Sequence, residues 1–160
     1  MITKTTSAAT SPGGAKDAIT LLKADHATVN ELFSDDEKVC SDAKKQTLVA
    51  EICTELSVHA QIEEKNFHLA VKAARKDKLL VPEANVEQAG VKELIAQLEG
   101  LEPDGEMYDT KVKVLFEYVK HHIKEEQNEM FPKVSSASLN LIELGARMTT
   151  RKADLLAVRG

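Results

Sequence analysis

Histidine and glutamate residues recur in this sequence at spacings that suit a metal site. His59 and Glu63 are four residues apart, and so are His122 and Glu126. Residues four apart project from one face of a helix, so each pair offers an imidazole nitrogen and a carboxylate oxygen together. His26 lies in a third segment of similar character. Mixed nitrogen and carboxylate ligands suit iron, manganese or zinc.

These five residues stand on apolar helical stripes rather than on polar faces. The stripes are Ile19, Leu22, His26, Val29 and Phe33; then Leu48, Ile52, Leu56, His59, Glu63 and Phe67; then Val112, Leu115, Val119, His122, Glu126 and Met130. An ionised glutamate in a helical core costs several kcal/mol unless a cation compensates its charge. No Lys or Arg shares these stripes. We therefore predict a bound metal ion.

Each feature has a simpler interpretation when it is taken alone. A single histidine on an apolar stripe is usually a core residue with a satisfied hydrogen bond. A single His-x-x-x-Glu pair is common on helix surfaces. Two such pairs and a third histidine, all on core stripes of separate helices, are much harder to explain by chance. This combination favours the metal site.

Other polar residues near the pairs are assigned different places. His121 adjoins His122 and points about 100° away on a helix, so we expect it on the surface or behind a ligand. His68 follows His59 by nine positions, roughly on the opposite side, and is not expected to bind metal. Glu55, one turn before His59, is a candidate to support that ring.

The elements that position these residues are all predicted to be helices. The stripes predict helices over about 16–33, 41–76, 82–100, 107–132 and 137–157. Four main helices with short connections predict an all-α, up-down-up-down four-helix bundle with an additional C-terminal helix. Residues 1–15, which are small and polar, are expected to form a disordered tail, and 16–158 to form one domain.

Composition excludes several classes of partner. Acidic and basic residues are interleaved and the net charge is -5, so neither nucleic acid nor a membrane surface is an expected partner. No apolar run approaches the roughly 20 residues that span a bilayer, and the first residues do not resemble a secretory signal. We therefore expect a cytoplasmic protein, monomeric or weakly oligomeric. Cys40 and Cys53 form no CxxC pair, and Cys53 is expected to be a core thiol.

The sequence resembles the hemerythrin HHE cation-binding family. The matching segments are LLKADHATVNELF, VHAQIEEKNF and VKHHIKEEQNEMFPKV, and the final LIELGARMTTRKADLL resembles the closing helix of bacterial members. The match covers roughly residues 17–157. Family members, myohemerythrin among them, form up-down-up-down bundles, which agrees with the fold expected from the stripes.

The resemblance implies a di-iron centre with an oxo or hydroxo bridge. His26, His59 and His122 would be terminal nitrogen ligands, and Glu63 and Glu126 would be bridging carboxylates. One iron would keep an open position for a small ligand. The resemblance therefore implies a protein that binds or senses dioxygen, peroxide or nitric oxide.

One residue departs from the family pattern. Bacterial relatives usually carry a histidine on the third helix, and Gln88 stands in its place here. An amide oxygen is a weaker iron ligand than imidazole, so Gln88 could bind weakly, hold a coordinated water, or leave the position vacant. By the family pattern the missing histidine serves the metal that His122 also binds. We expect an asymmetric centre whose second metal is looser, solvated or absent.

Two other functions remain open from the sequence. An exchangeable metal beside Gln88 would suit metal storage or homeostasis with a mononuclear or partly occupied site. A regulatory module whose fold depends on metal is the third alternative. No nucleophile or cofactor motif is recognisable, so no enzymatic reaction is assigned.

Overall fold

The computed structural model describes residues 17–39, 41–74, 80–135 and 139–159. The predicted disordered tail at 1–15 and Cys40 lie outside these residues. In the described ranges every regular element is helical, which confirms the predicted all-α class. Cys53 is buried and carries a free thiol, as expected.

The described residues form five long helical runs. They are α1 (Ala18–Lys38); α2 (Asp42–Ile62), the π-helix η3 (Glu63–Phe67) and α3 (His68–Ala74); α4 (Leu80–Glu99); α5 (Glu106–Glu125), the π-helix η4 (Glu126–Met130) and α6 (Phe131–Ser135); and α7 (Leu141–Arg159). Side-chain oxygens cap the starts of α1 and α2: Asp17 accepts from the backbone N–H of Thr20 at 2.8 Å, and Ser41 accepts from the backbone N–H of Lys44. These bonds satisfy donors that a helix start leaves free.

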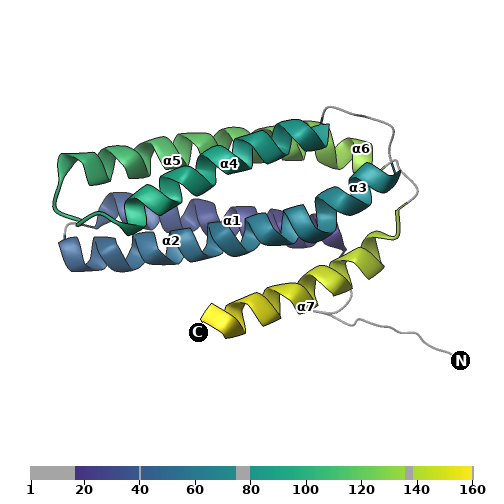
Figure 1. The fold of residues 1–160 in the computed structure, drawn as a ribbon, viewed down its shortest axis with the longest axis horizontal. Helices are drawn as coiled ribbons and strands as arrows, with labels where there is room; N and C mark the ends of the chain where they lie inside the picture. The colour runs from purple at the N-terminus through teal and green to yellow at the C-terminus, as the bar shows by residue number, and fades with distance from the viewer. Residues whose placement is uncertain (1–16, 40, 75–79, 136–138, 160) are drawn as a thin grey trace, which may run out of the picture.

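The first four runs lie lengthwise beside one another as a bundle (Figure 1). Helix α1 packs on α2, and α4 packs on α5. Helix α7 is additional to the bundle and packs on α1, α2 and η3. The predicted arrangement of four bundle helices plus a C-terminal helix is therefore present.

A polar layer divides the buried core into two apolar clusters. One cluster lies toward α3, α6 and α7 and includes Leu22, Phe67 and Phe131. The other lies toward the α1–α2 and α4–α5 connections and includes Ile52 and Leu115. Between them, in each of the four bundle helices, the buried residues are polar: Asp25 and His26, His59 and Glu63, Gln88, and His122 and Glu126.

Two π-turns are the main departure from the predicted helices. The long second helix contains one at Glu63–Phe67, and the long fourth helix contains one at Glu126–Met130. In each, a backbone N–H bonds a carbonyl five residues back: His68 to Glu63, and Phe131 to Glu126. A π-turn adds one residue to a turn, so it rotates all that follows by about 100° relative to an α-helix.

The fourth run also continues through Pro132, where an end was predicted. That prediction was wrong, because α6 extends over Phe131–Ser135. Proline normally interrupts a helix by removing one N–H and by crowding the carbonyl four residues back. Pro132 comes two residues after the end of the π-turn, whose wider winding already breaks the four-residue bonding pattern. The proline therefore disturbs less here than it would in an α-helix.

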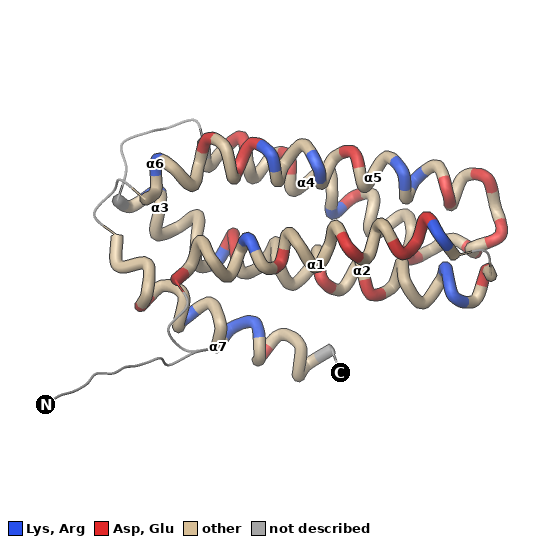
Figure 2. The backbone as a smooth tube through the Cα atoms, turned by 180° about the vertical axis from the view of Figure 1, so that it is seen from behind, with Lys and Arg blue, Asp and Glu red and all other residues tan. Residues whose placement is uncertain are grey.

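Lys and Arg alternate with Asp and Glu along the described backbone (Figure 2). None of the described helices is long and apolar enough to cross a bilayer.

The packing predicts how two Leu→Ala substitutions should differ. Leu115 is fully buried in the second apolar cluster, whereas Leu69 on α3 is 60% exposed. We expect Leu115→Ala to lower the free energy of unfolding by about 2–5 kcal/mol. Leu69→Ala should change it by no more than about 0.5 kcal/mol. Urea denaturation followed by circular dichroism measures both, and equal effects would contradict this core.

Candidate metal centre

The polar layer brings together residues that lie far apart in the sequence. His26 comes from α1, His59 and Glu63 from the second run, and His122 and Glu126 from the fourth. All five predicted ligand residues are buried, and Glu63 is fully so. His26, His59, Glu63 and Glu126 each place a ligand atom within 4.8 Å of the others. The structure thus gathers the predicted residues into one cluster.

The two carboxylates occupy the middle of this cluster. His26 Nε2 lies 3.0 Å from Glu126 Oε1, and His59 Nε2 contacts Glu63 Oε1. His122 Nε2 lies 3.5 Å from Glu63 Oε1 and 3.7 Å from Glu126 Oε2. Each glutamate therefore faces histidines of more than one helix, as a carboxylate shared between two ions would.

Several buried atoms of the layer have no hydrogen-bond partner among the described residues. They are His26 Nε2, His59 Nε2, Glu63 Oε2, His68 Nε2, Gln88 Oε1 and both carboxylate oxygens of Glu126. Buried polar atoms are normally satisfied, so such a concentration of unpartnered atoms needs an explanation. All are oxygen or imidazole nitrogen atoms, the donors that iron, manganese and zinc accept. These residues fit a bound metal ion.

Electrostatics in the layer also favour a cation. Burial alone would raise the pKa of the Glu63 carboxyl, but the adjacent His59 and His122 hold it well below its ordinary value. Burial alone would lower the pKa of His122, but Glu63 and Glu126 raise it to about 9. The carboxylates therefore favour positive charge beside them. A metal ion would displace protons from these imidazoles when it binds.

Hydrogen bonds on the outer nitrogens orient the histidine rings. His26 Nδ1 lies 2.8 Å from Gln127 Oε1, and His59 Nδ1 lies 3.1 Å from Asp25 Oδ2. An oxygen partner on Nδ1 leaves Nε2 with a free lone pair, which is the usual arrangement around metal-bound histidine. Asp25, rather than the predicted Glu55, supports His59.

Asp25 also links the centre to the additional helix. Lys152 of α7 donates to Asp25 Oδ1 at 2.6 Å. Burial would raise the pKa of Asp25, but its contacts with His59 and Lys152 lower it overall. Asp25 therefore stays ionised and holds the proton on His59 Nδ1. The sequence did not reveal this pairing, because Asp25 and Lys152 are far apart along the chain.

His68 lies at the centre, although the sequence placed it on the far side of its helix. Nine residues of uninterrupted α-helix would separate His59 and His68 by about 180°. The π-turn between them takes up one residue, which reduces this angle to about 80°. His68 is 2% exposed, and its Nε2 lies 3.2 Å from Glu63 Oε2. His121, by contrast, is exposed, as expected.

Gln88 faces the interior, as predicted, and lines a small apolar cavity. The cavity has a volume of about 30 Å³. Its walls are His26, His59, Gln88 and His122 together with Asp25, Val29, Leu56, Ala60, Val91, Val119 and Ile123. The amide oxygen of Gln88 is among the unpartnered atoms, so it is free to face a ligand in this space.

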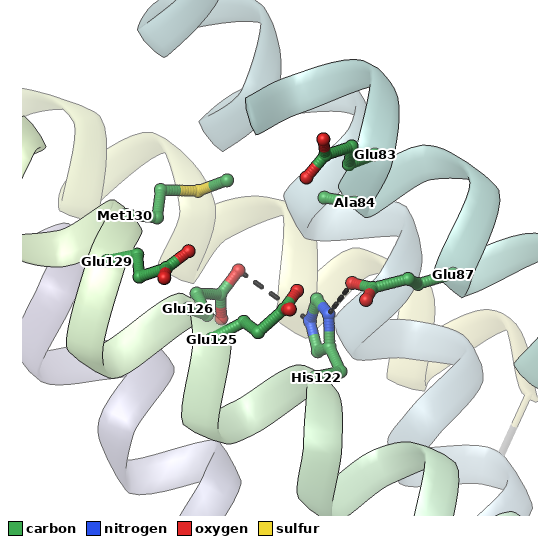
Figure 3. A pocket seen from close by; sticks show the side chains of 8 residues that line it. All are labelled: Glu83, Ala84, Glu87, His122, Glu125, Glu126, Glu129 and Met130. Carbon is green, nitrogen blue, oxygen red and sulfur yellow. Dashed lines mark ion pairs between the residues drawn. The ribbon is translucent and has the colours of Figure 1, made fainter. Parts of the chain in front are cut away.

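An acidic cleft reaches the other side of His122. It is lined by Glu83, Glu87, Glu125, Glu126 and Glu129 with Ala84, His122 and Met130 (Figure 3). His122 Nδ1 lies 3.6 Å from Glu87 Oε1. The burial of Glu87 and its contact with Glu125 raise the pKa of Glu87. The centre is therefore bordered by an apolar cavity and by an acidic cleft.

Fold and site together define a helical-bundle protein with a buried cluster of histidines and carboxylates that could hold a metal ion. The profile of the hemerythrin HHE cation binding domain matches residues 17–134. The chain therefore belongs to the hemerythrin HHE cation-binding domain family, which confirms the resemblance and assigns it to a metal-binding family.

Two known proteins are similar to the chain. The crystal structure of a hemerythrin HHE cation binding domain-containing protein from Mycobacterium kansasii shares the fold, with a TM-score of 0.77, 23% identity and 89% of each chain covered. A DNA nickase of Nostoc sp. (strain PCC 7120 / SAG 25.82 / UTEX 2576) is 25% identical over 111 residues. That match covers 69% of this chain but 31% of the nickase, so the chain spans about a third of that relative's length.

The support of His59 by Asp25 can be tested by Asp25→Asn. This substitution keeps the size of the side chain but removes the charge that holds the His59 proton and pairs with Lys152. We expect metal affinity to fall by about 10–100-fold. Competition with a chelator measures it. Asp154→Asn, at an exposed position on α7, is the matched control and should leave the affinity unchanged.

Proposed function

We propose that this chain binds two non-haem iron ions between Glu63 and Glu126. We further propose that the loaded centre binds a small ligand such as dioxygen, peroxide or nitric oxide, in sensing, delivery or scavenging. The observation that carries this proposal is the apolar cavity that adjoins His26, His59 and His122. Iron in this centre would supply a coordination position at which such a ligand exchanges.

The size and lining of the cavity support a small neutral ligand. Its volume of about 30 Å³ exceeds the roughly 10–15 Å³ that one water molecule needs, so the cavity has room for a ligand of a few atoms. Val29, Leu56, Val91 and Val119 offer no hydrogen bonds, so they favour an apolar diatomic molecule over water or a strongly hydrated ion. Larger substrates do not fit, and we assign no enzymatic reaction.

The residues around the cavity have separate roles in this proposal. The valine and leucine side chains exclude water and limit ligand size. Gln88 is positioned to donate a hydrogen bond from its amide nitrogen to a ligand, or to hold a water molecule through its oxygen. Asp25 keeps the proton on His59 Nδ1, so that His59 Nε2 remains a lone-pair donor.

Metal storage or homeostasis is the second candidate, and the acidic cleft is what favours it. Glu83, Glu87, Glu125 and Glu129 surround an opening of about 20 Å³ that reaches His122 and Glu126. Carboxylates attract cations and could pass them to the centre. In this case the His122 side would exchange its ion, and the centre would be mononuclear or partly occupied.

The activity of the nickase relative is not extended to this chain. The shared region covers 31% of that protein. The net charge of -5 gives this chain no general attraction for the phosphate backbone of DNA. The absence of nucleic-acid and membrane partners, the cytoplasmic location and the monomeric or weakly oligomeric state remain predictions.

Metal content and azide binding distinguish the two functions. We would purify the protein aerobically, measure metal per chain, and record the visible spectrum before and after adding azide. About two irons per chain with azide-shifted bands would support the ligand-binding centre. One iron or zinc per chain, with no response to azide, would favour the storage function. His59→Ala should lose metal, and His121→Ala, at an exposed position, should retain it.

Filling the cavity should weaken ligand binding without removing metal. Val91→Leu adds one methylene group toward a space of about 30 Å³. We expect azide and nitric oxide affinity to fall by about tenfold, equivalent to about 1.4 kcal/mol. Val86→Leu, on the same helix at a site 74% exposed, is the control. Spectroscopic titration measures affinity, and unchanged affinity in Val91→Leu at full metal content would exclude this cavity as the ligand site.

A further inference from the structure

We propose that His68 is a nitrogen ligand of the second metal ion and compensates for the histidine that Gln88 replaces. This proposal rests on the proposed two-metal centre and identifies the residue that completes it. It reverses the expectation of a loosely held second ion. Three features of His68 support it: its distances to the carboxylates, the partner of its outer nitrogen, and the π-turn that precedes it.

The two glutamates present different oxygens to different histidines. Glu63 Oε1 contacts His59, while Glu63 Oε2 lies 3.2 Å from His68 Nε2. Glu126 Oε1 lies 3.0 Å from His26 Nε2, while Glu126 Oε2 lies 3.9 Å from His68 Nε2. The Oε1 atoms therefore face His26 and His59, with His122 also near Glu63 Oε1, and the Oε2 atoms face His68. Bridging carboxylates divide their oxygens between two ions in this way.

His122 completes the second set. Its Nε2 lies 3.7 Å from Glu126 Oε2, the oxygen that His68 also approaches, and 3.5 Å from Glu63 Oε1, the oxygen that His59 contacts. Two atoms each about 2.1 Å from one metal ion lie about 3.0 Å apart at a right angle and about 4.2 Å apart on opposite sides. The contacts of 3.2, 3.7 and 3.9 Å fall between these limits. His68 and His122 thus each lie at distances from these carboxylates that two ligands of one ion can have.

The outer nitrogen of His68 contacts a side-chain oxygen, as the outer nitrogens of His26 and His59 do. Its Nδ1 lies 3.2 Å from Asn85 Oδ1 on α4. A carbonyl oxygen can only accept, so Nδ1 carries a proton, and Nε2 points at the carboxylates, where it would present its lone pair to a bound ion. Nε2 is buried and has no hydrogen-bond partner among the described residues. His68 is therefore oriented as a metal ligand rather than as a surface histidine.

A structural role for His68 is the competing explanation. As an imidazolium it would neutralise Glu63 and Glu126 without any second ion. The charge would then be its function, and a metal ion beside it would be repelled. The two roles predict opposite changes in metal content when the ring is removed, because a ligand is required for the second ion and a fixed cation excludes it.

Metal stoichiometry of His68→Ala tests the proposal. We expect iron to fall from about two ions per chain to about one, because the second ion loses an imidazole. Added imidazole should restore the second ion by entering the space left by the ring. Tyr118→Ala removes a ring from an exposed position of α5 and should keep the full content. Two ions per chain in His68→Ala would overturn the proposal.

A measurement on the unaltered chain tests the same proposal even if the variant misfolds. In cobalt(II)-substituted protein each metal-bound imidazole gives one exchangeable Nδ1–H signal shifted by the unpaired electrons. Ligation by His26, His59, His68 and His122 predicts four such signals, and a bystander His68 predicts three. Four signals support the proposal and three overturn it.

The outcomes also separate this inference from the proposed function. If the unaltered chain bound no metal, the proposed function would fail and the inference with it. If it bound two irons that remained in His68→Ala, only the role of His68 would be wrong. A single ion in the unaltered chain would exclude the second site and the role of His68, while leaving the chain a metal-binding protein.

Discussion

The structure depends on two carboxylates that lie where a helical bundle normally places leucine. Glu63 and Glu126 are 0% and 2% exposed, and water cannot solvate their charge. Each therefore needs positive charge and polar neighbours from several helices, and these neighbours form the polar layer between the two apolar clusters. The polar contacts continue outward from the carboxylates, since Asp25 hydrogen-bonds the ring of His59 and Lys152 donates to Asp25. One electrostatic constraint thus aligns α1, the two long runs and α7.

Both π-turns begin at these same carboxylates, at Glu63 and at Glu126. A π-turn has poorer geometry than an α-turn and is retained mainly where a side-chain position needs it. The rotation it introduces turns His68 toward the centre and still leaves Phe67 and Phe131 in the apolar cluster, where their rings meet edge to face with centroids 5.9 Å apart. Aromatic packing of this kind stabilises the fold by about 0.5–1.5 kcal/mol beyond burial and helps offset the irregular backbone.

Much of this architecture could be predicted from the sequence, because helical periodicity is a local property. The stripes located the bundle helices, and the same spacing placed His26, His59, Glu63, His122 and Glu126 in one interior layer. The π-turns could not be predicted, since a period of 3.6 residues assumes an uninterrupted α-helix. His68 was misplaced for that reason, and the end predicted at Pro132 was wrong for a related one. Asp25 was missed because its partners come from other helices, which periodicity within one helix does not reveal.

The two sides of the centre differ in a way that bears on what can reach it. The cavity beside Gln88 is walled mainly by aliphatic side chains, while the cleft beside Glu87 is walled mainly by carboxylates. A hydrated ion that enters an apolar cavity loses the free energy of its solvation, whereas a diatomic molecule loses almost none. An acidic wall repels anions and concentrates cations. Neutral ligands and metal ions are thus favoured on different sides of His122, which lines both spaces.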